Sequence, residues 1–275
     1  EIQTIEKEAF KLCRIESITI PSSLINLTEG WCVGALELSN VKVSPNNPRY
    51  RSYDDQTVIG KSSIENDEFD VLVFCSRNAK TIKIPTFIKH IDSYAFHECK
   101  KLTSIVIPTD SQLKIIGKNS FSLTSIEIIT IPSKVTEIKE RAFYVCKHLM
   151  QVNFLNDSKL KTIGKEAFSN SLINNISIPS QVTTIEEEAF SYCDQLHLIE
   201  FAKDSKLQTI GKSAFKKTLI RSMTIPSQVT QIARCIFDEC YYFNSIKFAK
   251  NSKIEKIDTN AFYNIGIESI SIPSN

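Results

Sequence analysis

This chain of 275 residues lacks a strong charge of either sign and any long apolar run. Its formal net charge is +2, and acidic and basic residues are mixed throughout, so it offers no electrostatic footprint for nucleic acid or for an anionic membrane. The longest apolar stretches are far shorter than the ~20 residues that a membrane-spanning helix needs. We therefore expect no nucleic-acid partner and no membrane span in this segment.

Motifs of catalysis and of metal binding are also missing. The sequence contains no G-x-S-x-G, no P-loop, no G-x-G-x-x-G and no H-E-x-x-H. Its eight cysteines include no C-x-x-C pair, and its four histidines are scattered, so a zinc site is not expected. The sequence predicts a protein that is not an enzyme and that has no cofactor.

Glycine is scarce, and its scarcity points to a repeat. Only seven glycines are present, and Gly117, Gly164 and Gly211 all stand in the phrase I-G-K. A chain of short elements needs many tight turns, so other residues at fixed places must make them. Two residue series do recur every 47 positions: Pro85, Pro132, Pro179, Pro226 and Pro273, and Cys99, Cys146, Cys193 and Cys240.

Each 47-residue unit contains two similar turns. Phe96, Phe143, Phe190 and Phe237 mark the first turn, and Phe121, Phe168, Phe215 and Phe262 mark the second. The phrase apolar-x-x-apolar-x-apolar starts each turn, at Ile15, Leu38, Ala79, Leu102, Ile126, Leu149, Ile173, Leu196, Ile220, Phe243 and Ile267. Its fourth and sixth positions point inward if the phrase forms a strand. A period of 20–29 residues with this phrase is typical of a leucine-rich-repeat solenoid.

The fold class that we predict is an α/β repeat, a solenoid of about eleven turns over residues 1–275 with a parallel β-sheet on its concave face. Segments such as ERAF, EEEAF and KSAF contain good helix formers, which predicts short helical or 3-10 pieces on the convex side. The chain begins at Glu1 and stops at Asn275 in mid-repeat, so we expect both ends to be truncated, with any targeting signal or anchor elsewhere.

The repeat is interrupted once, at residues 44–78. Two β-type runs, around residues 53–61 and 70–75, flank the polar stretch SSIENDEF. We interpret the segment as a β-hairpin inserted in the solenoid or projecting from it. The alternative is a degenerate repeat with a long loop.

The cysteines are predicted to be free. Cys99, Cys146, Cys193 and Cys240 lie two turns apart, on the order of 10 Å, which is too far for a disulfide bridge. The intervening turns have Thr124, Ser171, Thr218 and Ile265 at the same position, so this position favours a small side chain. Cys32, Cys75 and Cys235 fall outside the series, and we expect them to be partly exposed.

The phrase I-x-I-P-x-x-V-x-x-I-x-x-x-A-F-x-x-C-x-x-L resembles the BspA-like, Treponema-pallidum-type class of leucine-rich repeats. It is matched at Ile82–Leu102, Ile129–Leu149, Ile176–Leu196 and, with two changes, Met223–Phe243. The sequence around FDVLVFCSRNAKTIKIP is similar to that of surface-antigen-like members from protists of the trichomonad type. The resemblance implies a cell-surface or secreted solenoid used in adhesion, and it brings no catalytic or binding residues with it.

Two surfaces are candidates for binding. Outward strand positions on the concave face present mainly Ser, Thr and Asn, and the candidates there are Thr81, Lys83, Thr130, Gln151, Asn153, Asn175, Ser177, Glu200, Thr224 and Lys247. Equally, such residues suit any exposed strand. The inserted hairpin gathers aromatics and arginines that the repeat does not require, and its candidates are Arg49, Tyr50, Arg51 and Tyr53.

The function that the sequence predicts is a non-catalytic binding scaffold. By resemblance it is an adhesin-like surface protein that contacts host or microbial proteins or glycans. The alternative is an intracellular scaffold for protein–protein interaction, which unpaired cysteines favour. Uncapped terminal strands also offer a route to end-to-end or homo-oligomeric association. Asn26, Asn156 and Asn175 fit the acceptor pattern for N-glycosylation.

Overall fold

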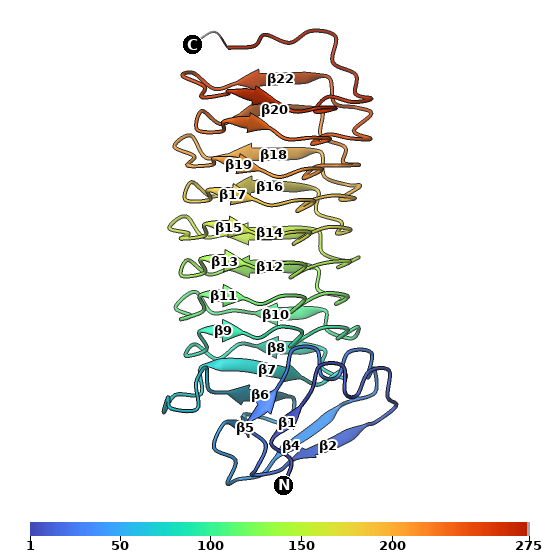
Figure 1. Cartoon of the computed structure of the whole chain (residues 1–275), viewed down its shortest axis with the longest axis vertical. Coiled ribbons are helices and arrows are strands. Elements are labelled where there is room, and N and C mark those ends of the chain that lie inside the picture. The colour runs from blue at the N-terminus through green and yellow to red at the C-terminus, as the bar shows by residue number, and fades with distance from the viewer. Residues whose placement is uncertain (274–275) are drawn as a thin grey trace.

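The computed structural model, described over residues 1–273, is a β-solenoid whose turns stack in a column (Figure 1). Each turn lays down one strand of three or four residues, which we call a long strand. The long strands are β2 (Ser17–Ile20), β4 (Asn40–Val43), β8 (Thr81–Lys83), β10 (Ser104–Val106), β12 (Ile128–Ile131), β14 (Gln151–Phe154), β16 (Asn175–Ile178), β18 (Leu198–Phe201), β20 (Ser222–Ile225) and β22 (Ser245–Phe248). Ten of the eleven predicted strand phrases thus form strands, and the one at Ile267 forms none within the described residues.

A second, short strand of two residues follows in most turns. These are β1 (Thr4–Ile5), β3 (Asn26–Leu27), β9 (His90–Ile91), β11 (Ile115–Ile116), β13 (Glu137–Ile138), β15 (Thr162–Ile163), β17 (Thr184–Ile185), β19 (Thr209–Ile210), β21 (Gln231–Ile232) and β23 (Lys256–Ile257). From β9 to β19 they pair in parallel in one continuous sheet. From β9 to β21 the inward residue of each short strand, such as Ile138 or Ile163, is buried.

The long strands pair only in twos. β8 bonds to β10, β12 to β14, β16 to β18 and β20 to β22, and no strand pairing joins one of these pairs to the next in the described chain. Paired long strands start 23 residues apart, as Asn175 and Leu198 do, whereas unpaired neighbours such as Leu198 and Ser222 start 24 apart. The 47-residue unit is therefore visible in three dimensions as a pair of bonded strands.

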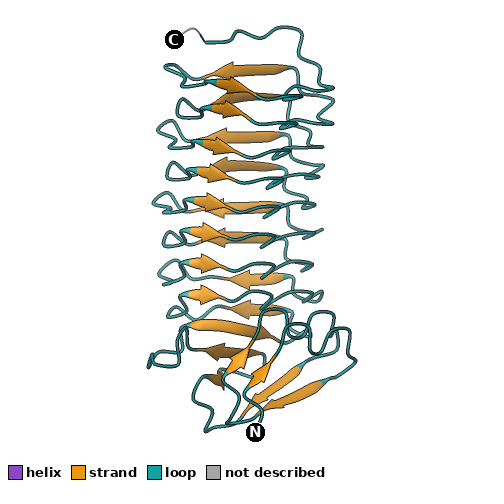
Figure 2. Ribbon diagram, in the orientation of Figure 1, coloured by secondary structure: helices purple, strands orange, loops and turns teal. Residues whose placement is uncertain are grey.

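The predicted helical segments are wrong. No helix occurs in residues 1–273, and Figure 2 shows strands and loops only. The amides of Arg141, Phe143 and Val145 donate to carbonyls of the next turn, at 2.8, 2.7 and 2.9 Å. Because neighbouring turns take every second amide, the i→i−4 bonds of an α-helix cannot form.

In these convex segments, residues other than glycine adopt the left-handed backbone conformation at fixed positions. Arg141 and Val145 have φ values of 54° and 55°, and the corresponding positions in other turns are also left-handed. Glycine is used where backbones meet closely. A Cβ at Gly164 would lie 2.7 Å from the carbonyl carbon of Lys139, which explains the I-G-K phrase.

Phenylalanine and cysteine fill the core of the column. The rings of Phe96, Phe121, Phe143, Phe168, Phe190, Phe215 and Phe237 form one stack with centroid spacings from 4.7 to 6.1 Å. All eight cysteines are free. The Cys146 thiol donates to the Phe121 carbonyl at 3.1 Å and lies 3.4 Å from the Thr124 hydroxyl, so the alternation of Cys and Thr also forms a hydrogen bond.

The insertion contributes β5 (Tyr50–Ser52), β6 (Thr57–Gly60) and β7 (Val71–Cys75). β6 is antiparallel to both β5 and β7, and β7 pairs in parallel with β9, so the three strands extend the sheet of short strands. Residues 70–77 are buried without a break. The hairpin thus does not project into solvent, and Cys75, like Cys32, is buried rather than partly exposed.

Strand β7 is buried because it lies between two hydrophobic cores. Leu72 and Cys75 belong to the core of the column. Val73 and Phe74 belong to a second core with Trp31 and Leu38. Most residues of this second core come from residues 1–43, which we call the N-terminal unit. Figure 1 shows β2 and β4 of this unit tilted against the strands of the column.

Candidate functional site

The predicted concave-face residues all lie on one surface, the outward side of strands β8 to β22, which we call the long-strand face. Thr81, Lys83, Gln151, Asn175, Ser177, Glu200, Thr224 and Lys247 are exposed, and Thr130 and Asn153 are half-buried. Alternate residues of these strands point inward and are buried, as Ile176 and Ile178 are.

Strand pairing brings several of these candidates together. Ser177 faces Glu200 in the β16–β18 register, and its hydroxyl donates to the Glu200 carboxylate at 3.2 Å. Thr130 faces Asn153, and Thr224 faces Lys247. The face also exposes apolar side chains, with Val106 at 52% and Ile128 at 50%. The long-strand face is therefore a polar surface with scattered apolar points.

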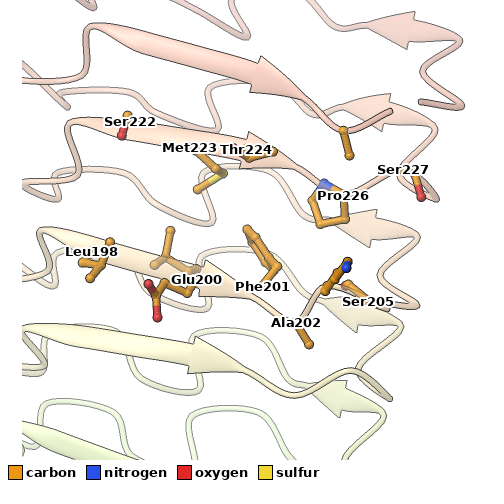
Figure 3. Close-up of a pocket in the computed structure, with 13 residues that line it drawn as sticks. Leu198, Glu200, Phe201, Ala202, Ser205, Ser222, Met223, Thr224, Pro226 and Ser227 are labelled. Atoms are coloured by element: carbon orange, nitrogen blue, oxygen red, sulfur yellow. The ribbon is translucent and has the colours of Figure 1, made fainter. Parts of the chain in front are cut away.

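A groove opens on this face between β18 and β20, which are not paired. Its volume is about 610 Å³, and Phe201, Thr224 and Pro226 line it. Figure 3 shows Phe201 reaching from the end of β18 toward β20, while Thr224 and Pro226 border the groove from β20 and the loop after it. Phe201 is only partly buried. Phe201 is the sixth residue of its strand phrase, which we expected to point inward, and yet its ring lines the groove.

The insertion places Arg51 and Tyr53 in an exposed aromatic cluster. The Tyr53 ring meets Phe87 edge-on at a centroid distance of 5.8 Å, and the Arg51 guanidinium lies over the Phe69 ring at 3.9 Å. Tyr53 is 47% exposed and Phe87 is 41% exposed. We call Arg51, Tyr53, Phe69 and Phe87 the hairpin cluster.

Charged side chains border the hairpin cluster. Arg51, Phe69 and Phe87 line a cleft of about 360 Å³ whose rim also includes Glu68 and Lys89. The Lys89 ammonium donates to the Glu68 carboxylate at 2.5 Å, and this ion pair raises the pKa of Lys89. Aromatic rings next to arginine are typical of binding hot spots in protein interfaces.

Arg49 and Tyr50 lie elsewhere. The Tyr50 ring is buried, and its hydroxyl accepts the Leu27 amide at 2.9 Å and donates to the Ile25 carbonyl at 3.5 Å. Arg49 is half-buried and lines a different cleft together with His90 and Asp92. The prediction of one hairpin site from four neighbouring residues is wrong for Tyr50, because this side chain joins the N-terminal unit to the insertion.

Phe69 and Phe87 were missed, although the sequence contains a signal for Phe87. The residue three positions before each later short strand is Gln or Lys: Gln112, Lys134, Lys159, Gln181, Lys206, Gln228 and Lys253. Side chains of this row bond to one another, as Lys134 does to Gln112 at 2.7 Å. Phe87 occupies the same position in its turn and breaks the row. Aligning the turns against one another would have marked it.

Potential metal ligands are not clustered on either surface within the described residues. No cluster of three or more His, Cys, Asp or Glu side chains able to hold a metal occurs within residues 1–273, and no helix there is long and apolar enough to cross a membrane. Burial raises the pKa of the Cys146 and Cys193 thiols to about 11, more than hydrogen bonds from Thr124 and Ser171 lower it. These cysteines are therefore poor nucleophiles at neutral pH.

Two other thiols and one backbone carbonyl contact a buried arginine. The Arg77 guanidinium lies 3.4 Å from the Cys99 sulfur and 3.4 Å from the Cys32 sulfur, and it donates to the Cys75 carbonyl at 3.2 Å. Cys32 belongs to the N-terminal unit, and Cys99 belongs to the column. This cluster joins the two cores and has no opening to solvent, because Arg77 is 4% exposed.

The three sequons are on the surface. Asn26, Asn156 and Asn175 are all exposed. Asn175 is on the long-strand face, and its side-chain amide donates to Asn174 at 2.8 Å. A glycan at Asn175 would cover part of that face, and this stays a prediction.

A model of the BspA-type leucine-rich repeat region, with six copies, matches residues 1–66, 67–197 and 161–275. The chain belongs to this family. BspA-type repeats form non-catalytic scaffolds, which agrees with a surface that offers contacts rather than reactive groups.

Solved structures show the same fold. A leucine-rich repeat protein from Bacteroides ovatus is 24% identical, with a TM-score of 0.61, over 97% of this chain and 58% of its own. A leucine-rich cell surface protein from Faecalibacterium prausnitzii is 19% identical, with a TM-score of 0.53, over 98% of this chain and 55% of its own. The T. pallidum leucine-rich repeat protein is 17% identical, with a TM-score of 0.50, over 78% and 85%.

The BspA-type chain spans little more than half of the length of the first two of these proteins. No curated protein matches it by sequence. The likeness to the solved structures therefore establishes the solenoid.

Proposed function

We propose that this BspA-type segment is part of a cell-surface or secreted protein of the adhesin type, which binds proteins or glycans of host cells or other microbes. Relatives of the same fold support the proposal, since one is described as a leucine-rich cell surface protein and another as a pneumococcal vaccine antigen. The scaffold would act by presenting side chains and would catalyse no reaction.

The observation that carries the proposal is the hairpin cluster. Exposed aromatic rings beside arginine are costly to leave in water and are typical of the few residues that dominate binding energy. Tyr53 and Phe87 come from segments 34 residues apart and meet at the surface, where the repeat would place a Gln or Lys. Their contact supports a protein-binding role for the insertion, and the long-strand face offers a second, more polar surface.

A second candidate is an intracellular interaction scaffold, which the eight free cysteines favour. Cys146 and Cys193 are buried thiols with raised pKa values, so they would also resist oxidation outside a cell. Free cysteines of this kind are compatible with both compartments. The choice therefore depends on where the protein is found, which labelling of intact cells with an antibody against this segment decides.

The hairpin cluster is tested by binding of the purified chain to intact target cells. Tyr53→Ala and Arg51→Ala should each weaken binding by roughly 5–30-fold, the range expected for an interface residue worth about 1–2 kcal/mol. Tyr263→Ala is the matched control, because Tyr263 is an equally accessible tyrosine, 58% exposed, outside the cluster.

Charge reversal at Lys83 and Lys247 tests the alternative, in which the long-strand face is the main binding site. Loss of binding in Lys83→Glu and Lys247→Glu, with full binding by Tyr53→Ala, would move the principal site to the long-strand face. Antibody labelling confined to the interior of permeabilised cells would reject the adhesin function itself.

A further inference from the structure

The groove between β18 and β20 is one of three that are equivalent in the repeat. A second lies beside β14, β16 and β18, with a volume of about 500 Å³, and a third lies beyond β22, with about 1110 Å³. Each has a phenylalanine at the end of a long strand, and these are 47 residues apart: Phe154, Phe201 and Phe248. Each also has a proline after the next strand phrase: Pro179, Pro226 and Pro273.

The 47-residue unit explains why the grooves recur. Long strands bond only within a unit, so the edge of β18 that faces β20 has no strand partner. The loop after β18 is also longer than the loop after β16, since eleven residues separate the starts of β18 and β19 and nine separate those of β16 and β17. Each unit therefore ends in an open strand edge beside a raised loop.

The three grooves share uncharged groups and differ in their charges. An exposed hydroxyl recurs at Ser177, Thr224 and Ser271. By contrast, the groove beside β14 includes Glu200 and Asp204, whereas the groove beyond β22 includes Lys247, Lys250 and Lys253. A ligand that uses all three grooves alike must be recognised through an aromatic ring, a hydroxyl and open peptide groups.

A peptide strand does not fit between β18 and β20. A strand inserted into a sheet has neighbours roughly 4.8 Å away on each side, so the flanking strands would need to be roughly 9.6 Å apart. Cα atoms of β18 and β20 lie within 8 Å of each other. The edge of β18 therefore cannot take an added strand, and a ligand at this groove must lie on the surface.

We propose that the three grooves form a track for a linear, uncharged glycan that runs along the stack. The grooves are two turns apart, about 10 Å at the usual strand spacing, which is comparable with two sugar rings of an extended chain. One sugar ring per groove would pack its C–H face on Phe154, Phe201 or Phe248, and its hydroxyl groups would bond to Ser177, Thr224 or Ser271. This inference specifies a ligand for the long-strand face and rests on the proposed function only in placing that face outside the cell.

The test uses the whole chain and neutral oligosaccharides prepared from chitin, cellulose and mannan, from disaccharides to octasaccharides. Affinity for the matching series should rise steeply with length until the glycan reaches all three grooves, because linked contacts add to avidity. Thr224→Trp, which fills the central groove without removing a core residue, should weaken binding of the longest oligosaccharide by at least about tenfold. Thr224→Val, which removes only the hydroxyl, should weaken it by a smaller factor.

Thr81→Trp is the control, because Thr81 is an exposed threonine on the same face outside the three grooves. Equal binding by Thr224→Trp and Thr81→Trp, or no binding of any neutral oligosaccharide, would overturn the glycan track, and so would a peptide ligand that Thr224→Trp displaces. The adhesin function would survive any of these results if Tyr53→Ala still reduced binding to cells. Conversely, glycan binding together with purely internal labelling would reject the surface role and leave the track standing.

Discussion

Arg77 brings a guanidinium into the interior beside Cys32 and Cys99, and a buried cation needs an opposite charge. Burial by itself raises the pKa of the Cys99 thiol, but the hydrogen bond with Cys75 and the Arg77 charge outweigh it and lower this pKa from 9.0 to about 7. Cys75, by contrast, has its pKa raised, mainly by burial. We therefore assign the thiolate that faces Arg77 to Cys99.

This assignment predicts a stability that depends on pH. Folding lowers the pKa of Cys99, so between pH 7 and pH 9 the unfolded chain holds more protons on this thiol than the folded chain does. Cys99 should therefore contribute a rise on the order of 1–2 kcal/mol in the free energy of unfolding from pH 7 to pH 9, and this contribution is lost as the pH falls through 7. Urea unfolding under reducing conditions, followed by fluorescence of the single Trp31, measures it.

Cys99→Ala should remove most of this rise. Cys146→Ala is the matched control, because burial raises the pKa of Cys146 to about 11, so that removing this thiol should not reduce the rise. A rise that persists in Cys99→Ala would show that the thiolate is not at Cys99.

At the scale of an element, the convex turn contains a strain that its neighbours avoid. Val145 has a φ of 55°, in the left-handed region that β-branched residues rarely adopt. The same position in the next turn is Asn170, with a φ of 61°, and asparagine tolerates this conformation well. The amide of Val145 donates to the Ser169 carbonyl at 2.9 Å, and this bond fixes the conformation.

We predict that Val145→Asn stabilises the protein by about 1 kcal/mol, since it relieves the left-handed strain and retains the backbone hydrogen bond. The expected rise in Tm is about 2–4 °C for a chain of this size, measured by circular dichroism. Val152→Asn is the contrasting variant, because Val152 is an inward strand residue, 6% exposed, and this change buries an amide. A lower Tm for Val145→Asn would mean that the packing of the valine outweighs the strain.

On the scale of the whole molecule, the protein consists of a column and an N-terminal unit, and a few polar contacts supplement the apolar packing between them. The Gly34 amide of the unit donates to the Glu98 carboxylate of the column at 2.7 Å. His97, next to Glu98, has its Nε2 3.6 Å from the same carboxylate, and its Nδ1 is buried without a hydrogen-bond partner in the described chain. Burial lowers the pKa of His97 to about 4, although Glu98 raises it.

This junction should weaken in mild acid. The unfolded histidine gains its proton near pH 6.5 and the folded one only near pH 4, so stability is complete above pH 6.5 and is lost as the pH falls toward 4. The expected loss is about 2–3 kcal/mol, from 1.36 kcal/mol per pKa unit. Because Trp31 lies in the core of the N-terminal unit, its fluorescence should report release of this unit before the column unfolds.

His97→Phe should retain the edge-on contact with Tyr94 and abolish the acid sensitivity. His148→Phe, at an exposed histidine, should leave the sensitivity as it is in the unaltered chain. If Trp31 fluorescence and circular dichroism changed together at every pH, the two parts would unfold as one, contrary to this prediction.

Residue spacing by itself determined much of this protein. The 47-residue period, the positions of ten long strands, their inward residues and the absence of disulfides all follow from which side chains recur and at what interval. These properties depend on the local alternation of a strand and on the distance along a stack, and both are set by counting residues.

Other properties depended on competition between neighbouring turns. Good helix formers such as Ala142 do not form a helix, because the amide of Phe143 bonds to the next turn instead. β6 and β7 are covered on both sides because residues 1–43 fold back over them, which no local pattern shows. The meeting of Tyr53 with Phe87, and the grooves at Phe154, Phe201 and Phe248, likewise arise only when separate turns are placed side by side.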